Sequence, residues 1–476
     1  MWTRFRELFS QFVRPLSELA GAPAGLWYVI GAFVVDSIAY FGILTLMTTF
    51  FSTDLHWPDA YATMTVSLFT MLVTLFMLGV GSFAESFGLR RAIATALLIS
   101  TVGRAIYCLL PGISGLAAAA VAVLSLLMVA AGEGILMPTC YSGVKQFTDE
   151  KSSSMGYAMI YALMNLGIVV IGTLSAWVRP GVQAILDGRD TAEVGKPILH
   201  WLASFSGSGV NAVNWLCCGI TGLTLLMFLT LMTSEEEAGR LRPEVQPATP
   251  SGPRPGLAAR CWSYFSEGPF GNSRFLFFIF MLLPVRTLFA HQWLTMPEYI
   301  LRSYPSAVGD KMEWLVNWIN PLIIFFGVPL ATMFTQRFHV YTMMIVGSFV
   351  SAAPTFLLGF GPNLTLLITY FVVFSIGEAL WSARFLEYAS ELAPAGRVAQ
   401  YMGLAQVPWL LAKGTTGLYS GYLLATFCPK HSPPAQMHTG TLWLIYACIA
   451  MTSPIGLWLG RNWVHRGLRH AERPAG

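Results

Sequence analysis

Long apolar segments recur along this chain of 476 residues, and they limit its fold more than any other feature. A helix needs about 20 apolar residues to cross a bilayer. Only 11% of the residues are charged and 55% are hydrophobic, which is typical of a chain whose main solvent is lipid. We therefore predict an all-α membrane protein with twelve transmembrane helices. The predicted spans are 25–53, 60–83, 90–110, 114–138, 154–178, 208–233, 274–299, 313–334, 339–360, 364–388, 397–426 and 439–461.

The distribution of positive charge predicts how these spans are oriented. Most of the 28 lysines and arginines fall in the two termini and in the loops on the same side of the membrane. The positive-inside rule therefore puts both termini in the cytoplasm, and we expect the cell (inner) membrane as the location. The net charge of +4 reflects this bias and indicates no nucleic-acid partner.

Composition also divides the chain into five predicted parts. The stretch after the sixth span begins with three glutamates and continues rich in proline, which is typical of a flexible linker. For the first residues, an in-plane amphipathic helix and a frayed terminus both fit. The predicted parts are an N-terminal cytoplasmic amphipathic segment, 1–24; an N-terminal six-helix bundle, 25–233; a cytoplasmic linker, 234–273; a C-terminal six-helix bundle, 274–462; and a cytoplasmic tail, 463–476.

The chain lacks the short motifs of the main enzyme classes. It has no phosphate-binding loop and no catalytic-triad spacing, so we expect neither an enzyme nor a catalytic residue. Its seven cysteines show no metal-ligand spacing and fit small apolar positions, so no metal or cofactor is predicted. A disulfide between Cys108 and Cys428, both near the external face, stays open.

Several ionisable residues interrupt the apolar spans. Each is a candidate for function, because an acid at the centre of a membrane helix costs about 3 kcal/mol. Glu378 lies in the middle of the tenth span with Ser375 on the same helix face. Asp36 lies near the middle of the first span, and Tyr40 shares its face one turn later. The others are Glu133 in the fourth span, Arg286 in the seventh and Lys413 in the eleventh.

A structural role is the alternative for each of these residues. Glu378 would then only hydrogen-bond a neighbouring helix, and Asp36 would pair with Arg104 of the third span; the others would pair with nearby charges. In the functional interpretation, Asp36 and Glu133 carry protons, since a carboxyl in apolar surroundings can lose its charge. Arg286 or Lys413 then holds the anionic end of a substrate.

The loop between the second and third spans carries a spaced set of glycines and charges, Gly81-Ser-Phe-Ala-Glu85-Ser-Phe-Gly88-Leu-Arg90-Arg91. This loop resembles the signature loop of the major facilitator superfamily, although anchoring by basic residues alone would also explain the arginines. Glycines let helix ends approach closely, and the charges can meet opposite helix ends. A faint echo at 327–337 fits a fold of two six-helix halves. The resemblance implies conformational gating by Gly81, Glu85, Gly88, Arg90 and Arg91.

Four further motifs resemble those of the proton-coupled oligopeptide transporter family within that superfamily. They are Ile160 to Gly167, which includes Asn165; Asn320-Pro321-Leu322; Gly377-Glu378 followed by Leu392-Ala-Pro394; and Met402-Gly403. They lie in both halves of the chain and in the family's order. The resemblance implies a divergent member that binds a substrate amine through Glu378, with Asn165, Asn320 and Tyr40 as polar partners.

The chain departs from this family where substrate carboxylates are bound and protons are coupled. The family's E-x-x-E-R-F-x-Y-Y-G aligns with Phe33 to Gly42, so one acid and the arginine are missing and Asp36 replaces the other acid. The family's G-x-G-x-x-K-P-N aligns with Gly132 to Thr139, where Met137 replaces the lysine. Glu133, which the motif does not require, is therefore a candidate for the lost coupling role.

Together these features predict a secondary active transporter that works by alternating access around a midplane site. The leading substrate is a small peptide or peptide-like zwitterion, moved with protons as a symporter. A carrier of a non-peptide organic anion or lipid-like solute, without proton coupling, is the first alternative, and the missing arginine and lysine favour it. A non-transporting receptor on a carrier fold is the second. The expected partners are the small-molecule or short-peptide substrate, protons and the lipid bilayer, and we expect a monomer.

Overall fold

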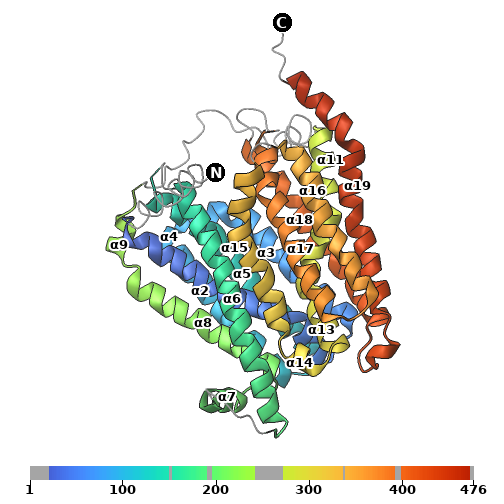
Figure 1. The fold of residues 1–476 in the computed structure, drawn as a ribbon. Helices are drawn as coiled ribbons and strands as arrows, with labels where there is room; N and C mark the ends of the chain where they lie inside the picture. The colour runs from blue at the N-terminus through green and yellow to red at the C-terminus, as the bar shows by residue number, and fades with distance from the viewer. Residues whose placement is uncertain are drawn as a thin grey trace, which may run out of the picture. The chain divides into compact units, whose positions relative to one another are not determined.

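The computed structural model describes residues 21–149, 153–189, 196–241, 272–335, 338–391 and 398–471, and this part of the chain holds helices and no strand (Figure 1). Ten of its helices are long and apolar enough to cross a membrane, and Met312–Val328 is a shorter apolar candidate. Most of the predicted N-terminal segment and most of the predicted linker lie outside the described residues.

The helices of the first half follow the predicted spans. The first one continues into a π-helical turn, Phe50–Asp54. The long helices are α2 (Ala24–Thr49), α3 (Asp59–Phe87), α4 (Leu89–Cys108), α5 (Gly115–Phe147), α6 (Ser153–Leu186) and α8 (Gly209–Leu231). Two short helices flank α8, namely α7 (Lys196–Ala203) and α9 (Ser234–Ala238).

The seventh predicted span is divided into three helices rather than one. These are α11 (Ser273–Met281), α12 (Leu283–Leu294) and α13 (Met296–Ser303). A proline stands in the first turn of both α12 and α13, where its missing N–H costs no helical hydrogen bond. The breaks place Arg286 in the first turn of α12 and Arg302 in the last turn of α13.

The remaining helices account for the last five predicted spans. They are α14 (Ser306–Gly309), α15 (Met312–Thr335), α16 (Val340–Ala352), α17 (Leu364–Glu391), α18 (Val398–Phe427) and α19 (Thr439–Ala471). At Pro354, α16 passes into a 3-10 helix, Ala353–Phe360. The prediction of an all-α membrane protein with twelve transmembrane helices is confirmed.

The helices form two compact units. Unit 1 consists of Met1–Leu46, Thr53–Leu55 and Leu72–Thr249, and unit 2 of Met47–Ser52, His56–Met71 and Pro250–Gly476. The first part of α3 therefore packs with the helices of the second half of the chain. The finer domain limits expected from composition stay a prediction.

In unit 1, α4 packs against both α5 and α8. The contact between α4 and α5 is close because Gly132 lies against Ser100, where any side chain would clash. This approach brings Arg104 of α4 beside Glu133 of α5. The disulfide considered for Cys108 does not form, since Cys108 and Cys428 are both free, buried thiols.

In unit 2, α17 packs against α15 and α16. Gly377 of α17 has no room for a side chain beside Ser351 of α16, so the two backbones lie close together. Small residues also let α18 approach the start of α3, since side chains at Gly417 and Gly421 would clash with Ser67 and Thr63. Unit 2 thus brings α15 and α18 against α17, and α12 against α18.

Candidate functional site

Glu378 on α17 is held by a neutral amide. Asn320 on α15 donates from Nδ2 to Glu378 Oε2 at 2.6 Å and to Ser375 Oγ at 3.1 Å. Ser375 in turn donates to the carbonyl of Phe371 at 2.6 Å. No ion pair between described residues involves Glu378. The structure therefore brings together two of the predicted substrate residues, and it gives this acid a hydrogen bond rather than a countercharge.

Arg286 on α12 lies among aromatic rings. Its Cζ atom is 4.3 Å from the ring centroid of Phe385, 5.4 Å from that of Trp381 and 5.8 Å from that of Trp409. The side chain is buried, and no ion pair between described residues involves it. Cation–π contacts stabilise a desolvated guanidinium without neutralising it, so this cation keeps a charge that an anion can meet.

Lys413 on α18 shares one of these rings with Arg286. Its Nζ atom lies 5.1 Å from the ring centroid of Trp409. Phe289 of α12 completes the aromatic group, with ring centroids 5.7 Å from Trp409 and 5.9 Å from Trp381. The two predicted cations are thus brought to a single aromatic cluster, made of Phe289, Trp381, Phe385 and Trp409.

One face of α17 joins the acid to this aromatic cluster. Glu378, Trp381 and Phe385 are spaced by three and four residues, so they follow one another along the same helix face. Three residues of helix rise about 4.5 Å, and seven rise about 10 Å. The helix face that carries Glu378 therefore also carries two of the rings that contact Arg286.

A second buried charge cluster lies in unit 1 and is centred on Arg104. The guanidinium donates from Nη1 to Asp36 Oδ1 at 2.7 Å and from Nη2 to Glu133 Oε1 at 2.6 Å. Thr221 on α8 also contacts Arg104 and donates to Asp36 Oδ1 at 3.1 Å. All four residues are buried. The structural pairing considered for Asp36 is thus present, and Glu133 shares the same partner.

The charges of this arginine-centred cluster, Asp36, Arg104, Glu133 and Thr221, do not balance when both acids are ionised. Two carboxylates and one guanidinium leave a net charge of −1, and an uncompensated charge is costly in a membrane interior. A single proton on either carboxyl brings the cluster to neutrality. The arrangement can therefore store one proton.

The other two predicted substrate residues lie in unit 1. Tyr40 follows Asp36 by one turn on α2, and its ring packs edge-on against Phe41 at 5.2 Å between centroids. Asn165 is buried on α6 and donates from Nδ2 to the carbonyl of Tyr161 on its own helix at 2.9 Å. Neither belongs to the group of Glu378 and Asn320 within unit 2.

The signature loop places Arg90 at the end of a neighbouring helix. Arg90 donates from Nε to the carbonyl of Met232, the residue that caps the C-terminus of α8. Its backbone N–H also donates to Glu237 Oε1 at 3.2 Å. Gly88 has φ +80°, which favours glycine, and is the N-cap of α4. Arg91 is exposed, and the surroundings of Gly81 and Glu85 lie outside the described part.

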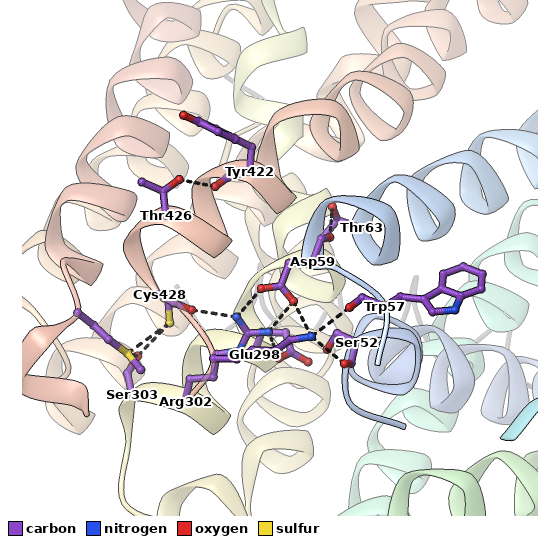
Figure 2. Close-up of polar contacts among 12 residues, drawn as sticks. Ser52, Trp57, Asp59, Thr63, Glu298, Arg302, Ser303, Tyr422, Thr426 and Cys428 are labelled. Carbon is purple, nitrogen blue, oxygen red and sulfur yellow. Dashed lines mark hydrogen bonds and ion pairs between the residues drawn. The ribbon is translucent and has the colours of Figure 1, made fainter. Parts of the chain in front are cut away.

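Sequence reasoning missed a group of four charges in unit 2 that we call the external cluster, after the side of the membrane on which the predicted orientation puts it: Asp59, Glu298, Arg302 and Lys430 (Figure 2). Arg302 binds both carboxylate oxygens of Asp59, at 2.7 and 2.8 Å, and donates to Glu298 Oε2 at 2.9 Å. Lys430 lies 3.2 Å from Asp59 Oδ1. Burial alone would lower the pKa of Arg302, but the carboxylates of Glu298 and Asp59 raise it above its usual range.

Backbone carbonyls complete the external cluster. Arg302 donates to the carbonyl of Cys428 at 2.9 Å, and Lys430 donates to those of Ser52 at 2.7 Å and Trp57 at 3.1 Å (Figure 2). The cluster therefore ties the start of α3 to the ends of α13 and α18. The i, i+4 spacing of Glu298 and Arg302 was its signal in the sequence.

A buried histidine was also missed. His291 on α12 has Nδ1 2.9 Å from Thr295 Oγ1 and Nε2 3.3 Å from the hydroxyl of Tyr419. Its ring stacks on Tyr446 with 3.8 Å between centroids. Its position inside an apolar span was the available signal. With both ring nitrogens partnered, His291 serves the packing of α12, α18 and α19.

Comparison with known proteins places this geometry in a family. The chain matches the Major Facilitator Superfamily over residues 29–412. No curated protein sequence matches it.

Solved structures with the same fold include three transporters. The chain is similar to a POT family transporter in complex with 5-aminolevulinic acid, at 15% identity and a TM-score of 0.64, over 93% of this chain and 97% of that one. It is also similar to the peptide transporter POT in complex with sulfate, at 14% identity and a TM-score of 0.68, over 93% of this chain and 95% of that one. For a bacterial homologue of the human drug peptide transporters PepT1 and PepT2, the identity is 16% and the TM-score is 0.67, over 93% of this chain and 98% of that one.

At these identities the likeness to solved structures establishes a shared fold. The superfamily match adds that most of the chain, including the spans that carry the arginine-centred cluster and Glu378, follows one family pattern. The chain therefore belongs to the major facilitator superfamily, as a multi-pass membrane transporter whose fold resembles that of POT family members.

Proposed function

We propose that this transporter moves a small zwitterion, with a short peptide as the leading class, by alternating access and together with protons. The observation that carries the proposal is that α17 places Glu378 and two rings that contact Arg286, those of Trp381 and Phe385, along one helix face in unit 2. Among the described residues, Glu378 has a neutral hydrogen-bond partner and Arg286 has aromatic partners, and neither is in an ion pair. A charge inside a membrane span without a countercharge is costly, so each group favours a ligand of opposite sign.

The two ends of such a substrate have distinct partners in the proposal. A substrate ammonium binds the carboxylate of Glu378, with Asn320 fixing its orientation. The substrate carboxylate binds Arg286 or Lys413, which replace the family's arginine and lysine that are absent from the first half. Tyr40 and Asn165, which lie in unit 1, stay predicted substrate residues. The peptide-transporter likeness of the solved structures supports this substrate class.

The proton enters the proposal through the arginine-centred cluster. Asp36 and Glu133 share Arg104 at similar distances, 2.7 and 2.6 Å. Gain or loss of one proton therefore changes which of the two carboxylates pairs with Arg104. These acids lie on α2 and α5, so the change alters a contact between two membrane helices. We propose that this exchange couples protons to the cycle.

The external cluster supports alternating access. The start of α3 precedes the signature loop of the first half, and here it is bonded to helices of the second half within unit 2. We propose that these bonds hold the external side closed and separate when it opens. We also propose that the signature loop takes part in conformational gating through the contact of Arg90 with the end of α8. The other gating residues proposed in this loop are Gly81, Glu85, Gly88 and Arg91.

Uptake into proteoliposomes tests this function. The purified chain is reconstituted, and uptake of a labelled dipeptide is compared with its N-acetylated and its C-amidated forms, with and without an inward proton gradient. We expect the free dipeptide to accumulate best and only with the gradient. Equal uptake of all three forms would exclude recognition of a zwitterion, and no uptake of any form would favour a receptor.

A second candidate function is carriage of an organic anion. Two cations, Arg286 and Lys413, share the aromatic cluster, which favours an anionic ligand with an apolar body. The same liposomes decide between the two. Uptake of an N-acetylated amino acid that exceeds that of the free dipeptide, without dependence on the gradient, would support the organic anion.

A further inference from the structure

The short helix α7 lies between two membrane spans and runs across their direction in Figure 1, at the end of unit 1 where α6 ends and α8 begins. It has eight residues, Lys196–Ala203. The candidate spans on either side are Met159–Leu186 and Gly209–Leu231. A segment so close to the ends of two spans is at the level where the bilayer meets water.

One face of α7 is fixed against α6. Leu199 and Leu202 are fully or almost fully buried, at 0% and 2% exposure. Leu199 lies against Gly181 of α6, where a side chain would collide with it. The buried leucines therefore determine which side of α7 points away from the protein.

The neighbouring face of α7 is apolar and exposed. Ile198 and Trp201 are 54% and 65% exposed, and Phe205, 43% exposed, follows four residues later in the turn after the helix. The rings of Trp201 and Phe205 meet edge-on at 4.9 Å between centroids, and Phe205 reaches Trp215 of α8 at 5.8 Å. This row, Ile198, Trp201 and Phe205, therefore forms a continuous apolar stripe that begins at the surface of α8.

We propose that α7 is an interfacial helix whose apolar stripe inserts into the headgroup region of the leaflet that borders it. Tryptophan and phenylalanine are enriched at this level of the bilayer, and helices of this kind lie with one face about 5–10 Å deep. The stripe adjoins Trp215 of α8, which is a candidate membrane span. Three side chains are also far fewer than the 20–30 residues that each partner contributes to a stable protein interface.

Site-specific fluorescence tests the proposal on the full chain in nanodiscs. An environment-sensitive thiol dye is attached at Trp201→Cys and, in a second variant, at Ile198→Cys. Both variants have Cys448, whose thiol is exposed, and Cys261 of the predicted linker replaced by serine. Asp187→Cys, on the polar turn after α6, is the matched control. We expect the stripe labels to emit at shorter wavelength than the control and to lose most of their emission to nitroxide-bearing lipid.

The outcomes separate lipid from other occupants. Quenching of the stripe labels by lipid nitroxide, with quenching of the control label by aqueous iodide, supports insertion. Quenching of all labels by iodide alone shows that the stripe faces water and overturns the proposal. A short-wavelength stripe label that neither quencher reaches shows that protein covers it, which also overturns the proposal. Two label positions guard against a variant that folds poorly.

Discussion

At Glu378, the cost of a charge inside a membrane span is directly linked to the need for a ligand. Its carboxyl group accepts one hydrogen bond at 2.6 Å from an amide, and no ion pair among the described residues includes it. An ionised carboxylate in a membrane span is stable only with further compensation. In the proposed function a substrate cation supplies this compensation, so we expect Glu378 to matter for binding more than for folding.

The Glu378→Gln variant should bind and take up substrate about ten- to a hundredfold more weakly, because a hydrogen bond to a charged group is worth about 1.5–3 kcal/mol. Glutamine keeps the size of the side chain and a partner for Asn320, so expression and thermal stability should stay close to wild type. Uptake and binding in proteoliposomes measure the effect. Ser375→Ala, on the same helix face, is the control and should lose far less; wild-type uptake in Glu378→Gln would contradict the assignment.

Arg286 and Lys413 make a separate prediction. If they hold the anionic end of the substrate, Arg286→Gln and Lys413→Gln should weaken binding of a free-acid dipeptide and leave binding of its C-amide nearly unchanged. The reason is that only the free acid loses a charge partner. Binding titrations with both ligands provide the measurement. Equal losses for both ligands would show that the cations serve the packing around Trp409 instead.

The sequence allowed part of this site to be predicted at the residue scale. An acid, an amide and two cations inside apolar spans are visible without a structure, because each breaks the composition of its span. The aromatic cluster was not predictable, since Trp381, Phe385 and Trp409 are ordinary apolar residues until α12 brings Arg286 among them. The partners of Asp36 and Glu133 were foreseen only as alternatives.

Among the elements, α3 and α13 are held together by the external cluster. Both Arg302 and Asp59 are almost fully buried, with side-chain exposures of 9% and 4%, so their attraction is weakly screened by water. Removing one member of a buried ion pair leaves the other charge without compensation, which typically costs about 3–5 kcal/mol. This contact should therefore govern how readily the start of α3 separates from α13 and α18.

The Asp59→Asn variant should accordingly loosen the start of α3. We expect a lower thermal unfolding temperature and faster reaction of the native Cys428 thiol with a membrane-impermeant maleimide, because the carbonyl of Cys428 is bound by Arg302. The control is Asp187→Asn, which breaks the exposed pair with Arg189 and should change neither quantity. Faster labelling that persists in Cys428→Ser would come from another thiol, and unchanged labelling in Asp59→Asn would exclude the proposed closure.

Helices were predictable from the sequence more readily than their interruptions. The length of an apolar run indicates a span, and the predicted limits of α2, α4 and α8 agree with the structure within a few residues. The three-part seventh span was not foreseen, although its two prolines lie at the breaks. A proline in an apolar run is compatible with a kink, a break or a new first turn, and packing against neighbours such as Ser453 decides among them.

For the whole molecule, the two groups of charge lie in different units. The arginine-centred cluster belongs to unit 1, and Glu378, Arg286 and Lys413 belong to unit 2. In the proposed function, substrate and proton therefore act on different helices, and coupling requires that protonation in unit 1 changes the conformation that unit 2 offers to the substrate. Such coupling requires that the proton binds one conformation more tightly than the other. A proton that bound both conformations equally would not shift the equilibrium between them.

The last prediction separates coupling from transport itself. Asp36→Asn and Glu133→Gln each remove one proton-carrying group from the arginine-centred cluster and leave a single carboxylate on Arg104. The cluster is then neutral without a proton, so the charge that a proton formerly balanced no longer exists. Each variant should lose accumulation driven by a proton gradient and keep counterflow exchange of substrate between the two sides. Thr221→Val, which removes a hydroxyl of the cluster but neither acid, is the control and should keep both activities.

Three outcomes of that experiment have distinct meanings. Loss of accumulation with counterflow retained supports Asp36 or Glu133 as the coupling group. If a variant loses both activities and also unfolds at a lower temperature, the acid is a structural partner of Arg104, since breaking a buried pair destabilises the fold. If the unsubstituted protein itself shows exchange but no accumulation driven by the gradient, the carrier is a facilitator or exchanger, and the buried pairs with Arg104 then serve only to hold α2 and α5 against α4.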